Sequence, residues 1–117
     1  MKVYRGTRQP DFKTIVTIND QPFNPQPSQN IWNHSPDGFN WGYGGSGPSQ
    51  LALAILLDHF GDTDLARKYY QDFKWNVISK LPDTWELTDQ QVEQAVYEIT
   101  MTPAKDMIST EIRREKK

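Results

Sequence analysis

The sequence predicts an α+β fold, and three features carry this prediction. A β-branched run near the N-terminus predicts antiparallel strands, apolar segments after residue 47 predict helices, and a glycine-rich aromatic stretch separates the two parts. We therefore expect a short antiparallel β-hairpin or three-stranded meander packed on three main helices. A long ordered loop, rich in glycine and aromatic residues, is expected to lie across them.

Length and composition predict one soluble domain spanning residues 1–117. The chain has no cysteine, which excludes a disulfide framework and thiolate chemistry. Its formal net charge of -2 gives no general attraction to nucleic acid. Residues 1–8 lack the apolar run of a signal peptide, and the longest apolar run is too short to span a bilayer. We therefore expect a cytoplasmic protein that does not enter membranes.

Residues 1–23 are expected to form β structure. The run at 13–19 is rich in isoleucine, valine and threonine and ends at an Asn-Asp turn pair. The segment 2–5 is its expected antiparallel partner, which would place Arg5 and Arg8 at or near the end of the hairpin. The chain after the turn pair adds a third strand in the meander alternative, until three prolines prevent regular pairing.

Residues 24–47 are expected to form one long ordered loop. Five of the seven glycines lie between Gly38 and Gly47, interleaved with large rings. Loops of this length inside a compact domain tend to be functional or disordered. Aromatic rings favour order, because they can anchor a segment that forms no ladder of hydrogen bonds.

Residues 48–101 are expected to form a core of three helices. The first begins at Pro48, with Gly47 or Ser46 as its cap, because the fixed φ of proline suits the first helical position. Its body is apolar nearly all round, which predicts a central helix covered on several sides. Gly61 supplies the left-handed residue that ends it.

The second and third helices are predicted by their caps and apolar stripes. Asp62 or Thr63 caps the second helix, whose stripe recurs every four residues as far as Leu81. A capping box at residues 88–91 begins the third helix. Residues 102–117 are expected to form a tail or a short helix with a basic end.

The glycine-rich stretch before the first helix is the main candidate binding segment. Four residues precede the proline: Gly44, Gly45, Ser46 and Gly47. Their amides, at the positive end of the helix dipole, would suit a phosphate or a carboxylate. The stretch lacks the lysine of a P-loop and the GxGxxG order, so the motif is not specific. In the alternative, the glycines only let the loop pass closely over the central helix, with Trp41 and Tyr43 in the core.

Two arginines bear on the choice between these alternatives. If the hairpin packs beside the start of the first helix, Arg5 and Arg8 face the glycine-rich stretch and supply positive charge for an anion. Otherwise they belong to a solvated hairpin tip. The residues alone leave both alternatives open.

No catalytic site, metal site or cofactor is predicted. His34, Ser35 and Asp37 are types found in nucleophilic sites, but neighbours on an extended loop seldom converge on one point. The Ser-Pro-Asp-Gly sequence there is typical of a β-turn. The carboxylates and His59 within residues 58–64 are better explained by helix ends and a cap than as ligands of a cation.

Part of the chain resembles a known family. The motif YRGTR at residues 4–8, the run SPDGFNWGYGGSGPSQLALAILLDHFGD from Ser35, and YYQDFKWNVISKLP after it are similar to a family of small proteins of unknown function from bacterial, phage and plasmid genomes. The resemblance implies no established activity or site residues. It implies a mobile-element setting, in which small near-neutral proteins often bind a host macromolecule.

Two functions from different classes follow as hypotheses. The first is a non-enzymatic binding protein, a phage or plasmid accessory factor that engages a host protein through the aromatic glycine-rich loop. The second is a module that binds a nucleotide or other phosphate ligand, with Arg5 and Arg8 as counter-charges. Nucleic acid is expected as a partner only through the basic tail. The candidate binding residues are Arg5, Arg8, Trp41, Tyr43, Gly44, Gly45, Ser46 and Gly47.

Overall fold

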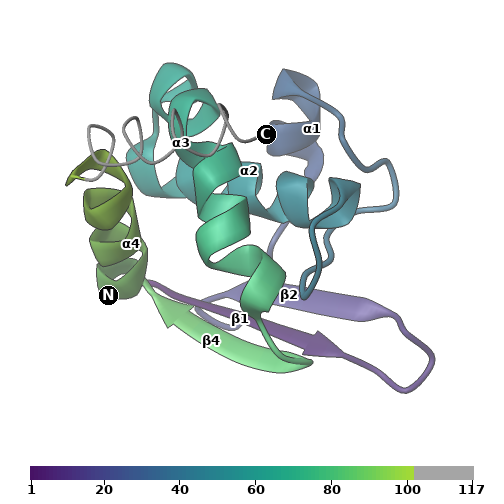
Figure 1. Cartoon of the computed structure of the whole chain (residues 1–117). Helices are drawn as coiled ribbons and strands as arrows, with labels where there is room; N and C mark the ends of the chain where they lie inside the picture. Colours follow the sequence, from purple (N-terminus) through teal and green to yellow (C-terminus); the bar gives the residue numbers. More distant parts are fainter. Residues whose placement is uncertain (102–117) are drawn as a thin grey trace, which may run out of the picture.

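The computed structural model describes residues 1–101 and contains a four-stranded antiparallel sheet with the α-helices gathered over one of its faces (Figure 1). The strands lie in the order β3-β2-β1-β4. The predicted α+β class is confirmed. The predicted tail at 102–117 lies outside the described residues. In the part of the chain that the structure covers, no helix has the length and apolar character that crossing a bilayer requires.

The N-terminal residues form the predicted meander. Its strands are β1 (Val3–Arg8), β2 (Thr14–Ile18) and β3 (Gln21–Pro22). A tight turn joins β2 to β3, and both turn residues have the positive φ that such a turn requires, 50° at Asn19 and 68° at Asp20. β1 is longer than predicted, because its register with β2 continues to Arg8 opposite Thr14. Arg8 is therefore the last residue of β1 and lies near the end of the hairpin, as predicted, whereas Arg5 lies within the strand opposite Thr17.

β4 (Thr84–Thr88) is a strand that was not predicted. It pairs with β1 on the side opposite to β2. The side chain of Trp85 lies across Gly6 of β1, where an added Cβ would come within 2.4 Å of the indole ring. Glycine at that position therefore makes room for the ring that covers this part of the sheet.

α1 (Gln26–Ile31) interrupts the predicted long loop. Pro25 is its N-cap residue and a further proline lies in its first turn. Proline suits these positions because the amides of a first turn have no partner within the helix. The prolines that end the sheet therefore also begin a helix, and the loop prediction for 24–47 was wrong over this stretch.

α2 (Ser46–Phe60) is the predicted central helix. It packs against α1, α3 and α4, and residues 47–56 are all buried, which confirms the expectation from its apolar sequence. Gly61 ends it with a φ of 63°, also as predicted. The helix begins before Pro48, with Gly45 as the N-cap residue, so the predicted start was two residues too late.

α3 (Thr63–Asn76) begins as predicted and ends early. The carboxylate of Asp62 accepts two main-chain N–H groups of the first turn and so caps it. The helix does not continue to Leu81. A short 3-10 helix, η1 (Ile78–Lys80), follows instead, and its first carbonyl accepts the N–H of Gly42 at 3.0 Å. A contact with the glycine-rich stretch thus takes the place of a further helical turn.

α4 (Asp89–Met101) follows β4 directly and has the predicted capping box. The N–H of Gln91 donates to Oγ1 of Thr88 at 3.1 Å, and the N–H of Thr88 donates to Oε1 of Gln91 at 2.9 Å. The predicted apolar face is buried at Val92, Val96 and Ile99.

Candidate functional site

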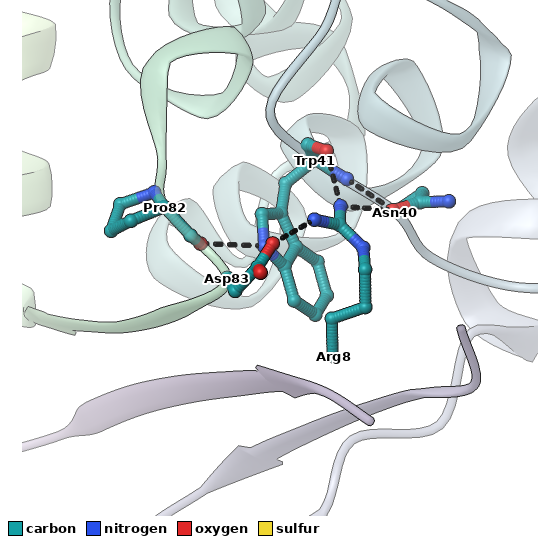
Figure 2. A network of polar contacts seen from close by, with 5 residues as sticks. All are labelled: Arg8, Asn40, Trp41, Pro82 and Asp83. Atoms are coloured by element: carbon teal, nitrogen blue, oxygen red, sulfur yellow. Dashed lines mark hydrogen bonds and ion pairs between the residues drawn. The ribbon is translucent and has the colours of Figure 1, made fainter. Parts of the chain in front are cut away.

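Arg8 fixes the glycine-rich segment 38–47 to the end of the sheet. Its guanidinium group donates to Oδ1 of Asn40 and to the carbonyl of Trp41, each at 2.7 Å, and pairs with the carboxylate of Asp83 (Figure 2). The guanidinium carbon also lies 5.0 Å from the centre of the Trp41 ring. The side chain is only 20% exposed, so these contacts are partly shielded from water. One side chain therefore ties β1, the segment and the approach to β4 together.

Trp41 anchors the same segment in the core. It is fully buried, as the packing alternative predicted, and its Nε1 donates to the carbonyl of Pro82 at 2.8 Å (Figure 2). Its ring meets that of Trp85 edge to face, with 5.6 Å between the centroids. Gly42 follows with a φ of 85°, a left-handed conformation that favours glycine.

Tyr43 does not enter the core, so the packing alternative was wrong for this residue. Its side chain is 49% exposed, and an added Cβ at Gly45 would come within 2.6 Å of its ring. Trp75 of α3 is 54% exposed and lies on Gly44 in the same way, within 2.2 Å of an added Cβ. Two half-exposed rings therefore rest directly on glycine main chain.

Phe12 brings a third ring to this part of the molecule. It lies in the connection between β1 and β2 and is 80% exposed. Its φ of 68° is left-handed, which costs a non-glycine residue about 1 kcal/mol or more. The turn is held by its own main chain, since the N–H of Phe12 donates to the carbonyl of Gln9 at 2.8 Å. We call Phe12, Tyr43 and Trp75 the aromatic surface.

A groove of about 520 Å³ lies between the hairpin tip and the glycine-rich segment. Phe12 and Lys13 belong to its hairpin wall, and Tyr43, Ser46 and Gly47 belong to the opposite wall. The structure thus brings three predicted site residues to one concave surface. Trp75 does not line the groove, but it adjoins it through Gly44, the neighbour of Tyr43.

The main chain beside this groove carries unused donors. The N–H groups of residues 43–47 donate to no acceptor within the described part of the chain. They include the first amides of α2, which have no partner within the helix. This arrangement fits the predicted phosphate-binding alternative as far as the amides are concerned.

The arginines predicted to face those amides lie elsewhere. Side chains alternate between the two faces of a strand, so residues three apart fall on opposite faces. Arg5 accordingly points to the outer face of the sheet, where it pairs with Asp20 at 2.9 Å and Glu86 at 3.6 Å. Arg8 is on the inner face, with its donors used as described above. Residues 44–47 therefore receive no hydrogen bond or ion pair from either arginine.

His34 holds the chain before the glycine-rich segment. Its Nε2 lies 2.8 Å from the hydroxyl of Tyr70, and its ring stacks on Trp32 with 5.0 Å between centroids. Two successive main-chain N–H groups, starting at His34, donate to Oε1 of buried Gln50 at 2.7 and 2.9 Å. Burial, and then the positive charge of Lys74, lower the pKa of His34 below its ordinary value.

Two further candidate residues, Ser35 and Asp58, have structural roles. The N–H of Gly38 donates to the carbonyl of Ser35 at 3.2 Å, which confirms the predicted β-turn. The carboxylate of Asp58 accepts from Nζ of Lys2 at 2.9 Å and from the hydroxyl of Tyr4 at 2.6 Å. Burial and this hydrogen bond raise the pKa of Tyr4 above its usual range. Within residues 1–101, no three His, Cys, Asp or Glu side chains are grouped as a metal site.

Two members of the aromatic surface were not predicted. Trp75 lies in α3 outside the predicted apolar stripe. A tryptophan on the face of a helix that does not pack into the core could have marked it as a surface-contact residue. Phe12 lies in the turn between two predicted strands, where a large apolar ring is likewise out of place. In both cases the informative feature is an apolar ring at a position that the core does not need.

Comparison with known proteins identifies a family but no activity. A model of a family of unknown function (DUF6166) matches residues 4–98, which is most of the chain. No curated protein and no solved structure gives a significant match.

Proposed function

This chain belongs to the family of unknown function DUF6166, and we propose that it is a non-enzymatic protein that binds a protein partner through the aromatic surface. One observation carries the proposal. Tyr43 and Trp75 are half exposed while their rings rest on glycine main chain. The segment beneath them is held by Arg8 and by buried Trp41.

Such rings have the properties of residues that dominate protein interfaces. Tyrosine and tryptophan provide a large contact area, and few rotatable bonds are immobilised when they bind. Rings that are already held in place lose still less freedom. The exposed position of Phe12, despite its left-handed φ of 68°, is in keeping with a contact role.

The resemblance described above supports a setting for this role. We place the protein in the cytoplasm of a bacterial cell, as an accessory factor of a phage or plasmid that engages a host protein.

The decisive experiment compares two truncations with a matched control. The full chain is immobilised, retained host proteins are identified by mass spectrometry, and the affinity of the principal one is measured by calorimetry. Tyr43→Ala and Trp75→Ala are each expected to weaken binding about thirtyfold, since central interface residues contribute about 2 kcal/mol. Tyr97→Ala, which removes a 56% exposed ring from α4, should leave the affinity unchanged. Equal affinities for all three variants would reject the aromatic surface.

A phosphate or nucleotide ligand is a second candidate function, favoured by the unpaired N–H groups of residues 43–47. The phosphate candidate has less support than the first, because neither Arg5 nor Arg8 lies beside these N–H groups to supply positive charge. A thermal-shift panel of nucleotides and inorganic phosphate tests it, because a ligand at one hundred times its Kd stabilises the folded state by about 2.7 kcal/mol. An unchanged Tm across the panel rules this candidate out.

A further inference from the structure

β4 forms one edge of the sheet (Figure 1), and the outward main-chain groups of Thr84 and Glu86 have no partner among residues 1–101. The N–H and C=O groups of successive residues in an antiparallel strand point alternately to either side. The N–H of Arg8 donates to the carbonyl of Asp83 at 2.9 Å, so Asp83 and every second residue after it face β1. Thr84 and Glu86 therefore face outward, where none of the described residues bonds to their main chain.

The two edges of the sheet differ in how they are protected. β3 has two residues and ends with Pro22, and Pro25 begins the helix that follows. Proline and short length both discourage further pairing. β4 is a regular strand of five residues with no proline and no lysine. Its single charge, on Glu86, is already paired with Arg5 at 3.6 Å.

We propose that the outer edge of β4 pairs with β4 of a second copy of this chain, antiparallel and about a two-fold axis. Thr84 of one copy lies opposite Glu86 of the other, and each of these pairs exchanges two main-chain hydrogen bonds. The interface is separate from the aromatic surface and does not depend on the function proposed for it.

Charge selects this register over the neighbouring one. A shift by two residues would place Glu86 directly opposite Glu86 of the second copy, and like charges directly opposite each other destabilise a sheet. In the proposed register each Glu86 lies between Arg5 of its own copy and a threonine of the other. The outer face of the joined sheet therefore has no like charges directly opposite each other.

The inner face also allows this pairing. The two-fold axis would pass beside Trp85, which is 5% exposed and meets its counterpart in the second copy. Its ring lies on Gly6 of β1 and so leans away from the edge. The main chains can therefore approach without a clash between two indole rings.

The first experiment measures the mass of the full chain by light scattering after gel filtration, over a dilution series. A species at twice 13.6 kDa is expected, dissociating on dilution. Glu86→Pro removes one outward N–H and leaves the pairs with β1 intact, so it should be monomeric. Glu86→Ala keeps that N–H and should remain dimeric. A monomer for the unchanged chain at every concentration, or a dimeric Glu86→Pro, would overturn the proposal.

The second experiment tests the register and does not need the proline variant to fold. The chain has no cysteine, so two introduced thiols report only on each other. Residues in a hydrogen-bonded pair lie about 5.5 Å apart between Cα atoms, within the range that a disulfide bridges. A mixture of Thr84→Cys and Glu86→Cys chains should form a disulfide-linked heterodimer under mild oxidation, and Thr84→Cys alone, which keeps the charge of Glu86, should form no link. No link between the two kinds of chain in the mixture, or a link formed by Thr84→Cys alone, would contradict the proposed pairing.

Discussion

Arg8 determines how the glycine-rich segment is held, through contacts that no other residue type reproduces. Its planar group donates to Asn40 and Trp41 while pairing with Asp83. Arg8→Ala is expected to lower the free energy of unfolding by about 2 kcal/mol, because partly buried acceptors lose a charged donor. Arg5→Ala is the control, and its exposed pairs should cost less than about 0.5 kcal/mol. Equal urea midpoints for the two variants would show that the Arg8 contacts are not structural.

His34 predicts a dependence of stability on pH. Its pKa is lowered in the folded state, so the unfolded chain binds the proton more readily. The stability associated with neutral His34 is therefore complete above the unfolded pKa of about 6.5 and decreases as pH falls below it. His34→Gln should flatten the decrease in unfolding free energy between about pH 6.5 and 5. His59→Gln, at the other histidine, should retain the decrease. Identical profiles for the unchanged chain and His34→Gln would contradict the assignment.

At Phe12, the substitution that suits the backbone is expected to weaken binding of the partner. Asparagine tolerates the left-handed conformation of this residue better than phenylalanine does. Phe12→Asn should therefore keep or raise the Tm, while it removes one ring of the aromatic surface and weakens retention of the partner. A lower Tm would show that the ring supports the fold instead.

At the scale of single elements, α4 depends on the cap that joins it to β4. Thr88→Ala removes the acceptor for the N–H of Gln91 and should cost about 1 kcal/mol in unfolding free energy. Thr84→Ala is the control, since that exposed threonine of the same strand makes no such bond. Chemical denaturation that gives both variants the same midpoint would reject the capping role.

Elements with strong local signals were predictable, and elements that depend on distant partners were not. The stop of α2 at Gly61 and the box at Thr88 follow from a few neighbouring residues. β4 is short and forms by pairing with β1, where Gly6 admits its tryptophan. The strand propensities of the residues in β4 do not include this glycine, so they could not predict the pairing.

The candidate site divides in the same way. The burial of Trp41 was predicted by the packing alternative, because a large ring among glycines can anchor such a segment in the core. The opposite orientations of Arg5 and Arg8 also follow from strand alternation, once both are assigned to β1. The contact of Trp75 with Gly44 joins segments that only the tertiary fold brings together, so it required the structure.

At the scale of the whole molecule, the helices cover one face of the sheet and bury α2 at the centre (Figure 1). The contacts proposed here use what this core leaves free: rings on the glycine-rich segment and the unpaired edge of β4. A protein that dimerises through β4 and binds a partner through the aromatic surface presents two partner sites in one dimer. Partner binding would then gain from avidity.

The unequal edges of the sheet set a limit on how far such joining proceeds. Each copy offers β4 for pairing, and a two-fold pair consumes both of these strands. The outermost strands of the resulting eight-stranded sheet are the two copies of β3, each closed by proline. No edge strand of the proposed dimer is therefore open to pairing with a third copy, and the assembly would stop at two copies and not grow into a fibre.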